Sequence, residues 1–118
     1  TDMAKINERP NPIKITDPDT NEVYTLDFDR EAVKFAARRG FKILEFQSVP
    51  ETGVSDLFFY AFRKNHKNVA RDKTDKILED LGGLLPEEVN RLQELYSASV
   101  SSINVEGTRK NSKMRVEL

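Results

Sequence analysis

The first residues that could do chemistry are the acidic and amide side chains of the segment DPDTNE. Asp17, Asp19 and Asn21 have the spacing with which an EF-hand loop begins its set of calcium ligands. The match then fails, because the sixth loop position is Glu22 instead of glycine and the twelfth is Phe28 instead of a bidentate glutamate. Asp, Pro and Asn also favour turns, so the segment predicts a hairpin turn that holds no metal.

Residues that commonly serve as nucleophile, base or metal ligand are scarce. The chain has one histidine, His66, and no cysteine. It therefore offers no zinc cluster, no disulfide and no Ser-His-Asp arrangement with a spare base, and it has no glycine-rich phosphate loop. His66 follows a predicted helix, where we expect it to cap carbonyl groups. We expect no enzymatic activity, no cofactor and no metal.

A basic stretch from Arg63 to Lys76 lies next to aromatic residues. Stacking of bases on Phe59 or Tyr60 beside such a stretch could bind single-stranded nucleic acid. The whole chain is nearly neutral, however, with 19 basic and 20 acidic residues and a formal net charge of −1. No bulk field attracts it to a polyanion. We therefore interpret the stretch as a solvated helix end and connection, and we do not expect nucleic-acid binding.

The length of 118 residues suits one domain of ordinary size. We expect a flexible arm over residues 1–12, a single globular domain over residues 13–104, and a tail over residues 105–118 that carries a C-terminal strand. The sequence contains no run of about 18 apolar residues, so no contact with a membrane is expected.

The N-terminal part of the domain predicts a hairpin and a helix. Apolar and polar residues alternate over 13–16 and again over 24–28, which is the period of half-buried strands. Asp29 can cap the helix that follows, and Gly40 can end it after two arginines. The junction over residues 41–55 carries Phe41, Ile43, Leu44 and Phe46, all expected to be buried, but its pattern does not choose between a strand and a helical turn.

The segment DLFFYAFRKNH predicts an aromatic helix that runs to about Lys64. One helical stripe holds the apolar residues Val54, Leu57, Phe58, Ala61 and Phe62. Phe59 and Tyr60 point to the flanks of this stripe. They are therefore either covered by neighbouring elements or available to a partner.

Two further helices and a strand complete the predicted elements. One helix begins near Asp72 or Thr74 and ends at Gly82 or Gly83, with Ile77, Leu78 and Leu81 facing inward. The next begins at Pro86 and spans about 18 residues, with apolar residues Val89, Leu92, Tyr96, Val100 and Ile103. Residues 113–118, KMRVEL, alternate strictly and predict a strand that pairs with the hairpin, within the chain or on a neighbouring subunit.

These elements predict an α+β fold that is mainly α. An N-terminal β-hairpin, which a C-terminal strand can join, packs on a bundle of about four helices.

Three stretches in this order resemble the tail assembly chaperones of phages with long non-contractile tails. They are VYTLDFDREAVKFAARRGF, DLFFYAFRKNHKNV and DKILEDLGGLLPEEVNRLQELY, and together they span Val23 to Tyr96. In that family a hairpin leads into a helix that ends in a Gly-aromatic pair, here Gly40-Phe41. An aromatic helix with a basic end follows, and a leucine-Gly-Gly break precedes the final helix.

The resemblance implies a non-catalytic protein in the cytoplasm of the bacterial host. Such a protein self-associates on the tape measure protein and recruits tail tube protein subunits; the family also makes a frameshifted longer form. The resemblance makes Phe59, Tyr60, Leu95 and Tyr96 the expected protein-contact residues. The alternative is a small structural or head-tail connector protein that stays in the virion.

Overall fold

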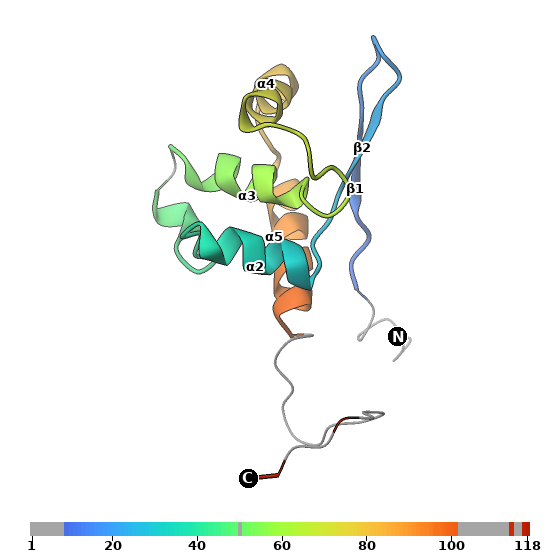
Figure 1. The fold of residues 1–118 in the computed structure, drawn as a ribbon. Coiled ribbons are helices and arrows are strands. Elements are labelled where there is room, and N and C mark those ends of the chain that lie inside the picture. The colour runs from blue at the N-terminus through green and yellow to red at the C-terminus, as the bar shows by residue number, and fades with distance from the viewer. Residues whose placement is uncertain (1–8, 50, 102–113, 115–116) are drawn as a thin grey trace, which may run out of the picture.

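The computed structural model describes residues 9–49, 51–101, 114 and 117–118. In these residues a two-stranded hairpin packs beside four α-helices and a short 3-10 helix, η1 (Figure 1). The elements in chain order are β1 (Ile13–Thr16), β2 (Val23–Leu26), α2 (Arg30–Arg38), η1 (Phe46–Ser48), α3 (Gly53–Ala61), α4 (Arg71–Leu81) and α5 (Pro86–Ser101). The predicted α+β class, mainly α with a hairpin on about four helices, is confirmed.

The hairpin is antiparallel, with Ile13 opposite Leu26, and its turn extends away from the helices (Figure 1). The backbone N–H of Asp17 donates to the Glu22 carbonyl at 2.8 Å, and the N–H of Asp19 donates to the Asp17 carboxylate at 2.9 Å. This carboxylate therefore stabilises the turn by the local bonding that favours Asp in such positions. The predicted hairpin turn is confirmed.

Helix α2 begins and ends as its sequence predicts. The Asp29 side chain accepts a hydrogen bond from the Ala32 N–H at 2.7 Å, which satisfies one of the unpaired donors of the first turn. Gly40 follows the helix with φ of +90°, a conformation that favours glycine. The buried face of the helix consists of small and branched residues, Ala32, Val33 and Ala36.

The junction between α2 and α3 forms turns and η1. Phe41 and Phe46 are buried as expected, and their ring centroids lie 6.4 Å apart. Leu44 is 95% exposed, so the expectation that it is buried is wrong. The residues 43–45 form a turn that sends Leu44 outward while Phe46, at the start of η1, returns to the core.

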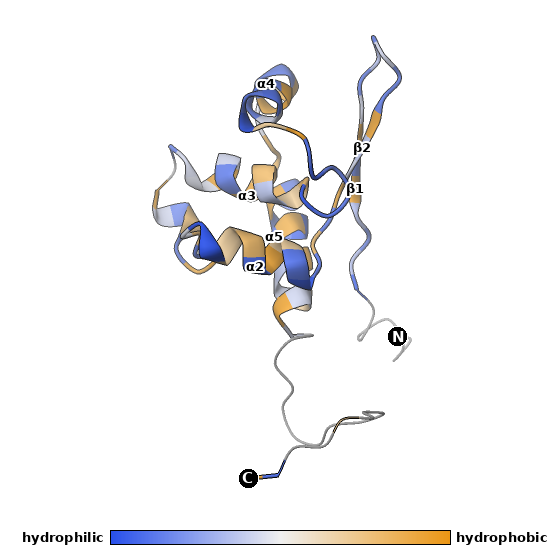
Figure 2. Cartoon of the chain, in the orientation of Figure 1, coloured by the Kyte–Doolittle hydropathy of each residue, from blue (hydrophilic) through white to orange (hydrophobic). Residues whose placement is uncertain are grey.

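Helix α3 is the central helix and makes contacts with α2, α4, α5 and η1. The facing sides of α2, α3 and α5 carry much of the hydrophobic colour in Figure 2. Because the helix has neighbours on several sides, residues outside the predicted stripe are also buried. The helix is shorter than predicted: it ends at Ala61, and the residues that follow form turns.

Helices α4 and α5 confirm the helix predicted from near Asp72 or Thr74 to Gly82 or Gly83 and the helix predicted from Pro86. Gly82 ends α4 in the left-handed conformation with φ of +78°. Leu81 is 47% exposed, which contradicts its expected inward position, while Thr74 of α4 is fully buried. The predicted strand over residues 113–118 lies largely outside the described residues. The residues of this segment that the structure describes, 114 and 117–118, are not in a strand.

Gly53 is required by a close approach between two elements. A Cβ atom at this position would lie 1.6 Å from the Phe46 carbonyl oxygen, so η1 and the start of α3 would have to separate. We expect Gly53→Ala to lower the free energy of unfolding by about 1 to 3 kcal/mol, the usual cost of overpacking. Chemical denaturation measures this, with Glu51→Ala as the exposed control in the same loop. Equal stability of the two variants would contradict the close approach.

Candidate protein-contact surfaces

The structure separates the four expected protein-contact residues. Tyr60, Leu95 and Tyr96 are buried, with 6%, 0% and 3% of their surface exposed, and only Phe59 is partly exposed. The expectation that the first three lie on the surface is therefore wrong. The contact role stays a prediction for Phe59.

Neighbouring aromatic rings explain why Tyr60 and Tyr96 are buried. The Phe41 ring, from the junction, lies 5.3 Å from the Tyr60 ring and 5.6 Å from the Tyr96 ring. The Phe28 ring lies 5.1 Å from that of Tyr96 in an edge-to-face arrangement. Burial raises the pKa of the Tyr96 hydroxyl, and the nearby Tyr60 raises it further. Leu95 is buried because the inward stripe of α5 is Leu92, Leu95, Tyr96 and Ser99, rotated from the predicted one.

Phe59 lies at the contact between α3 and α4. The Arg71 guanidinium lies 5.5 Å from the centre of its ring and also bonds to Asp56 at 2.9 Å and Asp75 at 3.0 Å. This arginine therefore ties the start of α4 to α3 and covers part of the ring.

Phe59 shares a small surface hollow with Phe35 of α2, which the sequence places on the apolar face of its helix and not among the contact residues. The hollow, of about 60 Å³, is lined by Phe35, Phe59, Phe62, Arg63, His66, Lys67 and Val69. The Arg63 guanidinium lies 4.1 Å from the Phe35 ring centre, and that of Arg39 lies 5.2 Å from it. We call Phe35, Phe59, Arg63, Lys67 and Val69 the aromatic-basic surface. Its chemistry suits a partner that presents apolar side chains next to carboxylates.

The outer edge of β2 is closed by the residues that follow α3. The Thr25 N–H donates to His66 Nε2 at 2.9 Å, and Asn65 Nδ2 donates to the Thr25 carbonyl at 3.2 Å. Two residues on, the Asp27 N–H donates to the Ala61 carbonyl at 3.0 Å. The expectation that His66 caps carbonyl groups is wrong, because its ring nitrogen accepts a bond from a strand N–H.

The outer edge of β1 is open among the described residues. The bond from Asp17 to Glu22 shows that these two residues form a hydrogen-bonded pair. Hydrogen-bonded and non-hydrogen-bonded pairs alternate along an antiparallel ladder, so Lys14 and Thr16 belong to non-hydrogen-bonded pairs. Their N–H and C=O groups therefore point away from β2. Within the described part of the chain these groups have no partner.

A groove of about 240 Å³ runs beside this edge. Its lining is mainly apolar and comes from β1, Leu26, Leu81, Leu84, Glu88 and Leu92. Leu81 and the neighbouring Leu85 are 47% and 56% exposed, while Ile13 and Ile15 are half-buried. We call the Lys14–Thr16 edge and this groove the β1 groove.

A third feature is a buried ion cluster at Asp27. Its carboxylate is 3% exposed and binds Arg9 Nη2 at 3.0 Å and Lys64 Nζ at 2.6 Å, and it accepts a bond from the Phe28 N–H at 2.8 Å. Arg9 also donates to the Phe28 carbonyl at 2.7 Å. The cluster joins the segment before β1, the end of β2 and the residues after α3. Arg9 therefore belongs to the packed domain although it lies in the expected flexible arm.

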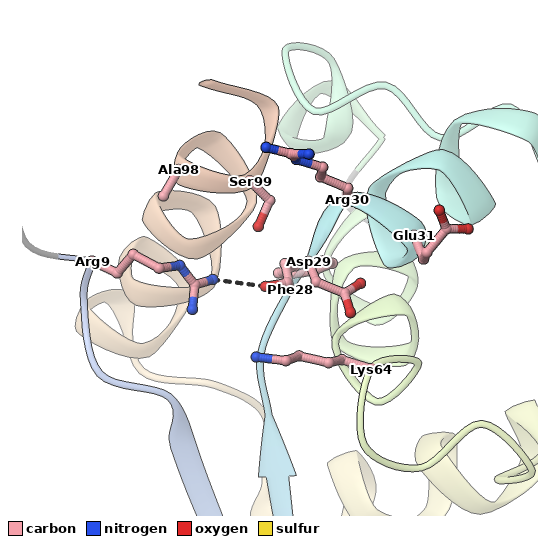
Figure 3. A pocket seen from close by; sticks show the side chains of 8 residues that line it. All are labelled: Arg9, Phe28, Asp29, Arg30, Glu31, Lys64, Ala98 and Ser99. Atoms are coloured by element: carbon pink, nitrogen blue, oxygen red, sulfur yellow. Dashed lines mark hydrogen bonds between the residues drawn. The ribbon is translucent and has the colours of Figure 1, made fainter. Parts of the chain in front are cut away.

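An open pocket of about 540 Å³ adjoins the cluster (Figure 3). Figure 3 shows Arg9 and Lys64 approaching Phe28 from different directions, with Ala98 and Ser99 on the neighbouring helix α5. Arg9, Arg30 and Lys64 are balanced by the carboxylates of Asp27, Asp29 and Glu31 around this pocket, so it offers no net positive charge to an external anion. In the described residues no group of three or more His, Cys, Asp or Glu could hold a metal, and none of the described helices is long and apolar enough to cross a membrane.

The Asp27 cluster makes stability depend on pH. Burial alone raises the pKa of this carboxyl, but hydrogen bonds from Arg9, Lys64 and the Phe28 N–H outweigh burial and leave the pKa below its ordinary value. A lowered folded-state pKa gives stability that is complete above the ordinary aspartate pKa of about 3.9 and is lost as pH falls through the folded value.

We expect Asp27→Asn to lower the free energy of unfolding near pH 7 by about 1.5 to 3 kcal/mol, the range for bonds to charged groups. The cost stays below that of a fully buried pair because Arg9 and Lys64 are partly exposed and regain water. The difference between variant and parent should shrink below about pH 3.9. Urea unfolding at several pH values measures it, with Asp19→Asn in the exposed turn as control. A constant difference across this range would contradict the ion cluster.

Phe58 and Phe59 are a matched pair that tests the orientation of α3. Phe58 is 1% exposed and packs edge to face on Phe62, so Phe58→Ala should cost about 3 to 5 kcal/mol of unfolding free energy. Phe59 is half-buried, so Phe59→Ala should cost about 1 to 2 kcal/mol. Thermal and urea unfolding of both variants compare these costs. Equal losses would mean that Phe59 is a core residue and offers no contact surface.

The comparisons with known proteins add one finding. No match was found among curated proteins or among solved structures. A protein-family model described as "Domain of unknown function (DUF5055)" matches residues 3–118, which is almost the whole chain. The chain therefore belongs to this family of domains of unknown function.

Proposed function

We propose that the protein is a non-catalytic tail assembly chaperone of phages with long non-contractile tails. It self-associates on the tape measure protein and recruits tail tube subunits, in the cytoplasm of the bacterial host. The proposal begins from the resemblance over Val23–Tyr96, whose hairpin, aromatic helix and leucine-Gly-Gly break are all elements of this fold.

The observation that carries the proposal is the aromatic-basic surface. Phe35 and Phe59 come from different helices, α2 and α3, yet they line one hollow together with Arg63 and Lys67. Partly exposed aromatic rings with arginines against them are typical anchors of protein interfaces. A long helical client that carries apolar and acidic side chains on one face would match this surface.

Co-expression with the tape measure protein of the same phage genome, followed by pull-down, tests the proposal. We expect the tagged chain to capture the tape measure protein. Phe59→Ala should weaken capture by about 2 kcal/mol, roughly thirtyfold. Leu44→Ala, which removes an exposed side chain from the junction, is the matched control and should leave capture unchanged.

The outcomes test the chaperone function and the role of the aromatic-basic surface separately. Failure of the parent chain to capture the tape measure protein would overturn the chaperone function. Capture that survives Phe59→Ala would keep the function and exclude the aromatic-basic surface. Mature particles give a second readout, because a chaperone is absent from them, whereas a structural or head-tail connector protein is retained.

A further inference from the structure

We propose that the β1 groove binds residues 113–118 of a second copy of the chain as an added strand. The inference deepens the proposed function, because it names the contact through which copies associate. It rests on the difference between the two edges of the hairpin, of which one is closed and the other open.

The chemistry of the open edge requires a strand. Lys14 and Thr16 turn two N–H and two C=O groups outward, at the spacing of a ladder. An extended segment satisfies such a row, as in recognition by strand addition. The β2 edge offers no such row, because His66 and Asn65 already bond the outward groups of Thr25, and Ala61 accepts from the Asp27 N–H just after the strand.

The groove beside the edge sets the side-chain pattern of the added strand. Its floor and wall include Ile15, Leu81 and Leu84, so every second residue of the strand must be apolar. Residues 113–118 have this pattern, with Met114, Val116 and Leu118 alternating with Lys113, Arg115 and Glu117.

Exposure and chain length favour a second copy as the source. Leu118 is fully exposed, so its side chain does not pack in the groove of its own chain. Eleven residues separate Ser101, the last residue of α5, from Lys113. Extended, they span at most about 36 to 40 Å, which is enough to reach a neighbouring molecule.

A contact of this kind uses the groove of one copy and the segment of the other, so the groove of the second copy and the segment of the first remain for further contacts. Such head-to-tail contacts build open chains or closed rings of copies. The β1 edge is only four residues long, so each single contact is weak and assembly depends on concentration.

The test uses two full-length variants, of which one disables the β1 groove and the other disables the C-terminal segment. Lys14→Pro removes an outward N–H but leaves the hydrogen-bonded pairs of β1 and β2 intact, since proline is tolerated on such edges. The double variant Met114→Asp, Leu118→Asp removes the apolar pattern of the segment. The controls are Lys14→Gln, which keeps the N–H, and Arg115→Gln, which keeps the alternation.

Sedimentation velocity over a range of concentrations should show growing assemblies for the parent chain and for both controls. Each disabled variant alone should be monomeric. A one-to-one mixture should form a two-chain complex, because one variant supplies the segment and the other supplies the groove. Circular dichroism checks that every variant is folded.

Other outcomes overturn the proposal. A monomeric parent chain excludes assembly through this contact; if the double variant is then also less stable, the segment binds within its own chain. A double variant that assembles like the parent indicates edge-to-edge pairing of two β1 strands. If the one-to-one mixture of the two disabled variants forms no complex, the segment of one copy does not bind the groove of another.

A labelled peptide of residues 111–118 gives a readout that does not depend on Lys14→Pro. It should bind the double-variant chain at least tenfold more tightly than the same peptide carrying Met114→Asp and Leu118→Asp. Equal binding would overturn the proposal. Both experiments use the chain alone, so their failure leaves capture of the tape measure protein as a separate result.

Discussion

The closure of the β2 edge by residues 61–66 is the interaction on which the rest of the structure depends. A two-stranded hairpin is marginal in water, so it needs a partner to persist. Here the partner is the end of α3 and the turn after it, which satisfy Thr25 and Asp27 by backbone, imidazole, amide and ammonium groups. The same contact places Tyr24 against Phe62, with ring centroids 5.7 Å apart, and brings Leu26 and Phe28 into the core.

The ion cluster at Asp27 belongs to this closure. A buried carboxylate is costly unless it is paired. Asp27 is paired with Arg9, which precedes the hairpin in the sequence, and with Lys64, which follows α3. The three positions meet only when the segment before β1, the end of β2 and the end of α3 are all in place. The cluster therefore favours one arrangement of the hairpin on the helices over alternatives in which the carboxylate would remain unpaired.

The sequence predicts the elements better than it predicts which residues are covered. Local signals are sufficient for the hairpin turn at Asp17, the cap at Asp29 and the end of α4 at Gly82, because each acts within a few residues. Tyr60 and Leu95 were expected on the surface because a helical stripe assumes one buried face. Tertiary packing determines which elements surround α3 and which face of α5 is buried. The apolar period of a single helix carries no information about either.

The aromatic-basic surface and the β1 groove differ in how much of each can be predicted from the sequence. Phe59 stands out because it leaves the stripe of its helix, but Phe35 lies on a different helix and is joined to it only by the fold. The β1 groove depends on the outward amides of β1 and on leucines some 65 residues further along the chain. Closing one edge of a hairpin with side chains and leaving the other beside an exposed apolar groove makes the molecule asymmetric. With the β2 edge closed, the hairpin can be extended only at β1, so the partner must be either a second β1 edge or another extended segment such as residues 113–118 of a second copy.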